Sequence, residues 1–134
     1  MRFRAALIAI APLLPALALA APAAKAPPKP GNVRHFSQQD GAALYRGVCQ
    51  GCHMPDGKGA VGAGKYPSLG ANPNLEAGGY AATLIINGQK AMPPLGPYLS
   101  DQQVAAVVDY VRAHFGNAYA SPVTLEEVRA ARPQ

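Results

Sequence analysis

The chain has 134 residues, of which 49% are hydrophobic, and its formal net charge is +5 at pH 7. This length suits a single domain. Removal of an N-terminal export signal containing Arg2 and Arg4 would lower the charge to +3, because ten basic residues would then face seven acidic ones. So small a charge, without basic residues interleaved with aromatic ones, gives no indication of nucleic-acid binding.

The N-terminus has the pattern of an export signal. Two arginines precede the apolar residues 5–19, and residues 18–20 form a small-x-small cleavage site. We therefore expect residues 1–20 to be a signal peptide and the mature protein to be periplasmic. The uncharged run of residues 5–24 is also long enough to span a bilayer, so a membrane anchor facing the periplasm is the alternative. Residues 21–34, rich in proline and alanine, are predicted to form a flexible lead.

Residues 35–117 are predicted to form the main domain, which begins with a helix. Ser37 is a suitable N-cap, and apolar residues then recur with helical spacing as far as Cys49. Gly41 lies inside this helix, where glycine is less favourable than alanine by about 1 kcal/mol. Gly41 is therefore either a point of close backbone approach or a tolerated glycine.

The helix leads into Cys49-Gln50-Gly51-Cys52-His53, which contains both cysteines of the chain. In an exported protein this is the attachment motif of c-type haem, in which two sulfurs bond to the porphyrin and the histidine ligates the iron. Cys49 and Cys52 share one face of a helical turn. Zinc would need further ligands, a redox-active dithiol would follow a strand, and a disulfide across this short gap would be strained. The motif predicts one covalent haem c.

A loop and a second helix follow the motif. Residues 54–70 contain five glycines and are predicted to form a loop. In this loop the carbonyl of Pro67 is a suitable acceptor for the second ring N–H of His53. Residues 75–87 are predicted to form a helix that Gly88 closes in the left-handed conformation. A strand near the end of this segment is the alternative, although no second strand is available to pair with it.

The clearest helical pattern lies in the C-terminal third. A capping box begins a helix at Ser100, and Gly116 is expected to end it. The apolar positions of this helix recur with a helical period and are Val104, Val107, Val108, Val111 and Phe115. Residues 118–134 are predicted to be a C-terminal extension with a short helix, begun by a second capping box of Thr124 and Glu127.

A six-coordinate haem needs a second axial ligand opposite His53. Met54 is too close in sequence to reach the other face of the ring, and His35 adjoins the flexible lead. His114 is better placed to interact with the C-terminal end of its own helix. Met92 lies in a loop stiffened by prolines, and a His/Met pair is one arrangement by which proteins hold haem iron. Met92 is therefore the preferred ligand.

Four ordered motifs resemble those of class I, monohaem bacterial cytochromes c. They are Gly41-x-x-x-Tyr45-x-x-x-Cys49-x-x-Cys52-His53, Pro67-x-Leu69, Ala91-Met92-Pro93-Pro94, and a final helix with Val107 and Tyr110. The resemblance covers residues 37–117. It implies an all-α, small cytochrome c fold wrapped around one covalent haem, with His53 and Met92 as the axial ligands.

The resemblance also implies supporting roles for four residues. The carbonyl of Pro67 would hold His53, and Leu69 would lie against the ring. The first and last helices would cross near Gly41 and Tyr110, which would explain the unfavourable glycine.

In function, the resemblance implies a one-electron carrier that links a dehydrogenase donor to an oxidase or reductase acceptor. The lead and the extension resemble segments of cytochrome subunits of periplasmic dehydrogenases, so a dedicated subunit of a membrane-associated complex is the alternative. A haem enzyme with an open distal site is a weaker hypothesis, because Met92 would block that position. Lys58, Lys65 and Lys90 are either ordinary solvated surface charges or a positive rim around the haem edge that attracts an acidic partner.

Overall fold

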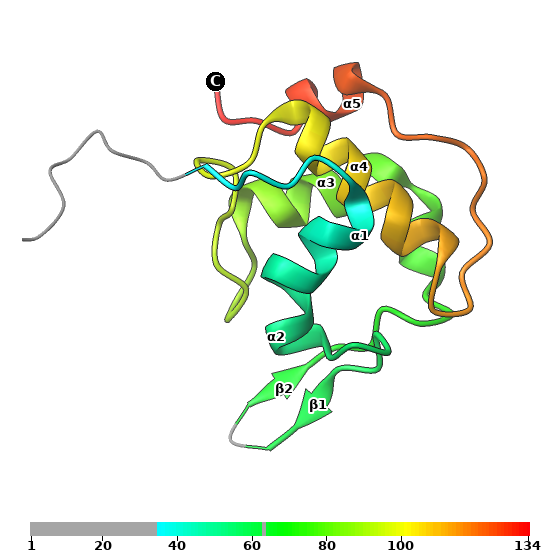
Figure 1. The fold of residues 1–134 in the computed structure, drawn as a ribbon. Coiled ribbons are helices and arrows are strands. Elements are labelled where there is room, and N and C mark those ends of the chain that lie inside the picture. Colours follow the sequence, from blue (N-terminus) through cyan, green and yellow to red (C-terminus); the bar gives the residue numbers. More distant parts are fainter. Residues whose placement is uncertain (1–34, 63) are drawn as a thin grey trace, which may run out of the picture.

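The computed structural model describes residues 35–62 and 64–134 (Figure 1). The predicted signal peptide of residues 1–20 and the predicted lead of residues 21–34 lie outside the described residues. In the described part the regular elements are helices apart from one short hairpin, which confirms the all-α fold class. None of the helices in this part is long and apolar enough to cross a membrane.

The first helical stretch runs from Gly41 to His53. It consists of α1 (Gly41–Leu44), a π-helical turn (Tyr45–Cys49) and α2 (Gln50–His53). Asp40 caps the stretch, because its Oδ1 accepts a hydrogen bond from the Ala43 amide at 2.8 Å. Single π turns are rare in proteins, and those that occur often lie at functional sites. The stretch ends at the residue predicted to bind iron.

The predicted start of this helix at Ser37 is wrong. The Gln103 side chain, from α4 (Asp101–Ala113), donates hydrogen bonds at 2.7 Å to the carbonyl oxygens of both Phe36 and Gln38. These bonds hold the segment before Asp40 against α4 in a non-helical conformation. The capping role therefore falls to Asp40, the next suitable residue.

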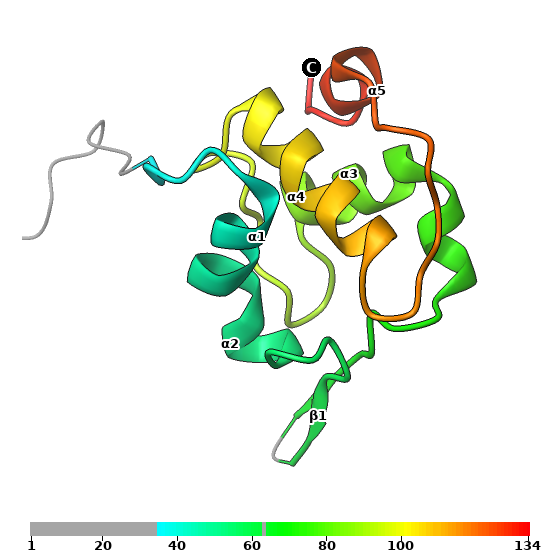
Figure 2. The ribbon, with the colours of Figure 1, turned by 45° about the vertical axis from the view of Figure 1, so that its right-hand side comes forward.

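The predicted loop of residues 54–70 contains a small antiparallel hairpin. In it β1 (Ala60–Val61) pairs with β2 (Lys65–Tyr66). A Cβ on Gly59 would lie 2.1 Å from the carbonyl oxygen of Tyr66, so only glycine permits this close return. Strands of two residues leave no alternating pattern in a glycine-rich sequence, and the sequence does not predict them. Figures 1 and 2 show the hairpin projecting from the body of the molecule beyond α2.

The helix predicted over residues 75–87 is divided into two. A 3-10 helix (Pro73–Glu76) begins after Asn72, whose side chain accepts from the Asn74 amide. Ala77 then has φ −86° and ψ 101°, which break the helix, and α3 (Gly78–Asn87) follows. All of residues 78–87 are helical, so the alternative of a strand near the end of this segment is wrong.

Both α3 and α4 end differently from the predictions. Gly88 follows α3 with the expected positive φ of 71°, but its ψ of 169° places it outside the left-handed helical region. The last residue of α4 is Ala113 rather than one next to Gly116, because His114 is extended, with φ −126° and ψ 177°. The polypeptide turns away from the helix axis before Gly116 is reached.

The core is built around α4, which lies between α1 and α3 in both ribbon views (Figures 1 and 2). Its capping box is present as predicted, with Ser100 and Gln103 bonding reciprocally. A Cβ on Gly41 would lie 2.1 Å from the carbonyl oxygen of Ala106 and 2.7 Å from Cβ of Tyr110. The implied crossing of the two helices near Gly41 and Tyr110 is therefore present, and it requires glycine.

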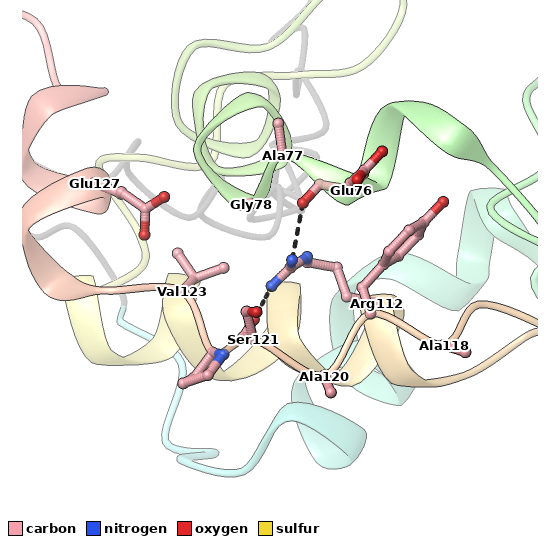
Figure 3. A pocket seen from close by; sticks show the side chains of 11 residues that line it. Glu76, Ala77, Gly78, Arg112, Ala118, Ala120, Ser121, Val123 and Glu127 are labelled. Atoms are coloured by element: carbon pink, nitrogen blue, oxygen red, sulfur yellow. Dashed lines mark hydrogen bonds between the residues drawn. The ribbon is translucent and has the colours of Figure 1, made fainter.

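The C-terminal extension packs onto α3 and α4 through α5 (Leu125–Ala130). Its predicted capping box is present, and Val128 is fully buried. Arg112 of α4 holds the segment that leads to α5. Its two terminal nitrogens donate to the carbonyls of Glu76 and Ser121 (Figure 3). Its Nε donates to the carbonyl of Leu75. A cavity of about 460 Å³ lies beside this bonded arginine.

Candidate functional site

The motif residues lie where the first helical stretch ends. Cys49 is the last residue of the π turn, and Cys52 and His53 belong to α2. Cys49 is half-buried, Cys52 is exposed, and both thiols are free. The helix stops directly after His53 because Met54 has φ 65° and ψ 160°. One short stretch thus presents two unpaired thiols and an imidazole, the donor set that covalent haem requires.

The imidazole of His53 is oriented by Pro67. Its Nδ1 lies 3.0 Å from the carbonyl oxygen of Pro67. A carbonyl only accepts hydrogen bonds, so Nδ1 carries the proton and donates it. The lone pair of the neutral ring is then on Nε2, which leaves that nitrogen as the one able to ligate a metal. The contact agrees with the acceptor role predicted for Pro67.

Burial changes the acidity of one of the two thiols. It raises the pKa of Cys49 to about 11, with a smaller contribution from the neighbouring Cys52. At neutral pH the Cys49 sulfur is therefore a protonated thiol rather than a thiolate. Because the thiolate is the reactive form in disulfide exchange, the Cys49 sulfur is a poor nucleophile in this environment.

The loop that carries Met92 is tightly closed. Gln89 and Met92 exchange backbone hydrogen bonds of 3.0 and 2.9 Å, and Met92 is half-buried. A Cβ on Gly88 would lie 2.6 Å from the carbonyl oxygen of Met92, so the closure depends on glycine. In both ribbon views this loop extends from the end of α3 toward α2 (Figures 1 and 2). The fold thus brings the segment of Met92 to the same side of the molecule as the motif.

The other candidate ligands have different surroundings. His114 places Nδ1 2.6 Å from the carbonyl oxygen of Tyr110 and stacks on the Tyr110 ring at 4.0 Å, so it interacts with the C-terminal end of α4 as predicted. His35 is exposed at the beginning of the described residues. Met54 adjoins His53 and turns the chain away from the helix. Met92 remains the preferred partner for His53.

Several apolar side chains near these segments suit a porphyrin. Leu69, Ile85 and Leu95 are only half-buried although they pack against the core. They come from the loop after the hairpin, from α3 and from the loop that carries Met92. Burial of their remaining apolar surface would be favourable, and a haem held at Cys49 would supply a large apolar partner. The donor set and these side chains together fit a haem.

A bare metal ion finds no such arrangement. Within residues 35–62 and 64–134, no group of three or more histidine, cysteine, aspartate or glutamate side chains is gathered to hold a metal ion.

Two further residues support the motif, although the sequence predicted no role at the site for either of them. Tyr45 is 1% exposed, and its hydroxyl donates to the carbonyl of Met54 at 2.7 Å. Phe115 is predicted as part of the last helix but lies beyond it with φ 60°, and its ring covers Gly57. The only sequence signal for either of them is the position of Tyr45 in the Gly41-x-x-x-Tyr45 run.

The basic residues expected around the haem edge differ in their pairing. Lys58 lies 3.0 Å from Asp56 in an ion pair, which reduces its contribution to the field. Lys65 lies on β2 and Lys90 in the loop before Met92, and both are exposed. Of these three lysines, Lys65 and Lys90 therefore carry the charge that no ion pair among the described residues offsets.

Comparisons with known proteins agree with the site. The family model described as "Cytochrome C oxidase, cbb3-type, subunit III" matches residues 37–111. The fructose dehydrogenase cytochrome subunit of Gluconobacter japonicus is 40% identical over 112 residues, which cover 71% of this chain and 23% of that protein. The gluconate 2-dehydrogenase cytochrome c subunit of Pantoea cypripedii is 31% identical over 106 residues, which cover 70% of this chain and 24% of that protein.

A much shorter relative aligns over almost its whole length. Cytochrome c6 of Euglena gracilis is 34% identical over 85 residues, which cover 60% of this chain and 97% of that protein. By contrast, this chain spans about a quarter of the length of the two dehydrogenase subunits.

Proposed function

This chain belongs to the cytochrome c family represented by subunit III of cbb3-type oxidases, and from that premise we propose that it binds one haem c through Cys49 and Cys52 and carries single electrons in the periplasm. The observation that supports this best is the 3.0 Å contact between His53 Nδ1 and the Pro67 carbonyl. Because this hydrogen bond engages Nδ1, Nε2 is the imidazole nitrogen that can ligate the iron.

Each residue of the site has a task in this proposal. The haem supplies one-electron redox chemistry at its iron. Cys49 and Cys52 would hold the haem covalently, and His53 would ligate its iron through Nε2. The Met92 thioether would be the other protein ligand of the iron and would raise the reduction potential. Leu69 and the other half-buried apolar residues exclude water from the ring, which favours the less charged reduced state.

Mass spectrometry and optical spectra test the cofactor and its ligands. The exported protein should carry the mass of one haem that survives denaturation and acid-acetone extraction. Met92→Ala should keep the haem but lose the near-infrared band of methionine-ligated ferric haem, and its potential should fall. Met54→Leu is the matched control and should keep the band. Freely extracted haem, or a band that persists in Met92→Ala, would contradict the assignment.

A dehydrogenase as donor and an oxidase or reductase as acceptor are the proposed partners. Lys65 and Lys90 would attract an acidic surface, and this attraction acts mainly on the rate of association. Lys65→Glu and Lys90→Glu should slow electron transfer at low ionic strength and flatten its dependence on salt. Arg129→Glu makes the same charge change on α5, away from this side, and should have little effect. Equal slowing by all three variants would argue against docking here.

A second candidate is a dedicated subunit of a dehydrogenase complex. The two relatives named as dehydrogenase cytochrome subunits favour it. A tagged chain purified from its own host under mild conditions separates the two hypotheses. A subunit should co-elute, in constant ratio, with a dehydrogenase activity that reduces the haem when substrate is added. A carrier should elute as a monomer and be reduced only at a concentration-dependent rate. In either case, the mass of the purified chain shows whether residues 1–20 have been removed.

A further inference from the structure

The backbone directly after His53 adopts a conformation that residues with side chains rarely take. Met54 has φ 65° and ψ 160°, a region in which glycine is otherwise found. Such a conformation persists only where its surroundings hold it. Because this turn adjoins the iron-ligating histidine, the groups that hold the turn also fix the backbone from which the imidazole projects.

Tyr45 is the side chain that holds the turn. Its hydroxyl donates to the carbonyl oxygen of Met54 at 2.7 Å and lies 3.5 Å from that of His53. The same two carbonyls accept hydrogen bonds from the amides of Gly57, at 3.2 Å, and of Gly59, at 3.0 Å. The tyrosine therefore adds a side-chain bond to a turn that the following loop also closes.

The position of the Tyr45 hydroxyl is itself fixed from the end of α4. The Tyr45 ring lies 4.9 Å from the ring of Phe115 and 5.5 Å from that of Tyr110, between centroids. Phe115 has φ 60°, and its ring occupies the space into which a Cβ on Gly57 would extend, at 2.5 Å. Burial is the main cause that raises the pKa of Tyr45 to about 12, so the hydroxyl keeps its proton at neutral pH.

Gly57 connects the turn to the acceptor of the imidazole. Its carbonyl oxygen accepts a hydrogen bond from the Leu69 amide at 2.7 Å. Leu69 lies two residues after Pro67, whose carbonyl faces His53 Nδ1. A shift of the turn would therefore move both the backbone that bears the imidazole and the loop that bears its acceptor.

We propose that the Tyr45 hydroxyl is a positioning group for the axial histidine. By holding the Met54 turn, and through it Gly57, the hydroxyl keeps the His53 imidazole against the Pro67 carbonyl. This inference rests on the proposed haem function. The hydroxyl does not touch the iron, and its effect is on the strength and direction of the Nδ1–H hydrogen bond. That bond raises the basicity of the ligand, so weakening it should make the reduction potential more positive.

Tyr45→Phe tests the proposal, because it removes the hydroxyl and keeps the ring. In the haem-loaded variant the His53 Nδ1 proton and the Gly57 amide should exchange with solvent about tenfold faster, the factor expected for loss of one ordinary hydrogen bond. The electron paramagnetic resonance spectrum of the ferric form should change its g anisotropy, and the potential should rise. Tyr119→Phe is the matched control, since its hydroxyl also donates to a backbone carbonyl, that of Asn72.

The outcomes separate this proposal from the haem assignment. Changes in Tyr45→Phe that are absent in Tyr119→Phe support a positioning role. A Tyr45→Phe protein with the exchange, spectrum and potential of the unmodified protein overturns it. An unmodified protein without the spectrum of an imidazole-ligated haem would instead overturn the proposed function.

A measurement on the unmodified protein covers the case in which Tyr45→Phe does not fold. The Tyr45 hydroxyl proton should give a slowly exchanging resonance with a through-space contact to Met54. If this proton exchanges freely in the haem-loaded, unmodified protein, the hydroxyl does not hold the turn and the proposal is wrong.

Discussion

The motif segment (residues 41–70) and the C-terminal segment (residues 101–132) are similar in length but differ in what holds them. Among the described residues of the motif segment, only Leu44, Tyr45 and Gly57 are buried. The C-terminal segment buries ten residues: Gln103, Val104, Ala105, Val107, Val108, Val111, Arg112, Asn117, Val123 and Val128. The polypeptide alone supplies a core to the second segment but little to the first.

Side-chain hydrogen bonds also hold the C-terminal segment more extensively than the motif segment. In the C-terminal segment two arginines are each held by three acceptors, Arg112 by backbone carbonyls and Arg132 by Asp101 and two carbonyls. In the motif segment the hydrogen-bonding side chains are shorter in reach: they bond only to backbone groups of the same glycine-rich segment, and they are those of Tyr45, His53, Asp56 and Ser68. The difference fits the proposal that a haem completes the core of the motif segment, with the C-terminal segment as its support.

Removal of the covalent attachment should produce the largest effect and tests this division directly. In the double variant Cys49→Ser and Cys52→Ser, we expect no covalent haem and a large loss of amide protection over residues 41–70. Protection should be retained longer over residues 101–132, because that core is made of polypeptide. Hydrogen exchange followed by mass spectrometry measures both. Equal loss in the two segments would mean that they fold as one unit.

Arg112→Met should have the next largest effect and weakens the supporting segment. Loss of the guanidinium leaves the carbonyls of Leu75, Glu76 and Ser121 without their donor. We expect the free energy of unfolding of the haem-loaded protein to fall by about 3 kcal/mol, measured by urea denaturation.

Arg129→Met is the matched control for this change. Its side chain is 63% exposed and lies 3.4 Å from Asp101, so its loss should lower stability by at most about 0.5 kcal/mol. Similar losses in the two variants would show that burial of Arg112 contributes little.

The contact between the two segments can be tested with a pair of glycines. Gly41→Ala would place a Cβ 2.1 Å from the Ala106 carbonyl oxygen, and we expect a loss of about 2 kcal/mol from the forced separation of α1 and α4. At Gly47 the nearest atom to a new Cβ is 3.7 Å away, so Gly47→Ala should be neutral or stabilising by up to about 1 kcal/mol. Chemical denaturation of both proteins decides the point. A harmless Gly41→Ala would contradict the tight crossing.

What could be predicted from the sequence depends on how far apart the interacting residues are. The haem-attachment motif at Cys49 and Cys52 and the capping boxes at Ser100 and Thr124 are made of residues within a few positions of each other, and such signals are visible in a single sequence. The approximate positions of the main helices follow for the same reason, but the break at Ala77 does not.

The features that the sequence did not predict depend on distant contacts. The first helix begins at Asp40 because Gln103 holds the preceding segment. Phe115 leaves the last helix to cover Gly57, and no local pattern announces that partner. The role of Tyr45 was missed because its hydroxyl bonds to a backbone carbonyl, which has no side-chain signature.

The smallest expected effect concerns the beginning of α5, at the edge of the C-terminal segment. Hydrogen bonds from the Thr124 amide and then from its hydroxyl lower the pKa of Glu127 below its ordinary value of 4.5. A carboxylate whose pKa is lowered by folding stabilises the folded state above its unfolded pKa, and this contribution is lost as the pH falls through the folded value. The capping box should therefore weaken in acid, below about pH 4.5.

Glu127→Gln isolates this contribution, because an amide oxygen can still accept from Thr124 but does not titrate. Between neutral pH and pH values below the unfolded pKa, amide protection in α5 should fall less in Glu127→Gln than in the unmodified protein. Glu126→Gln removes a neighbouring carboxylate outside the capping box and should behave like the unmodified protein. Because iron ligands can also protonate in acid, the comparison is made between proteins at the same pH and is confined to α5. If both variants respond identically, the acid sensitivity of α5 arises from its packing on α4 and not from its cap.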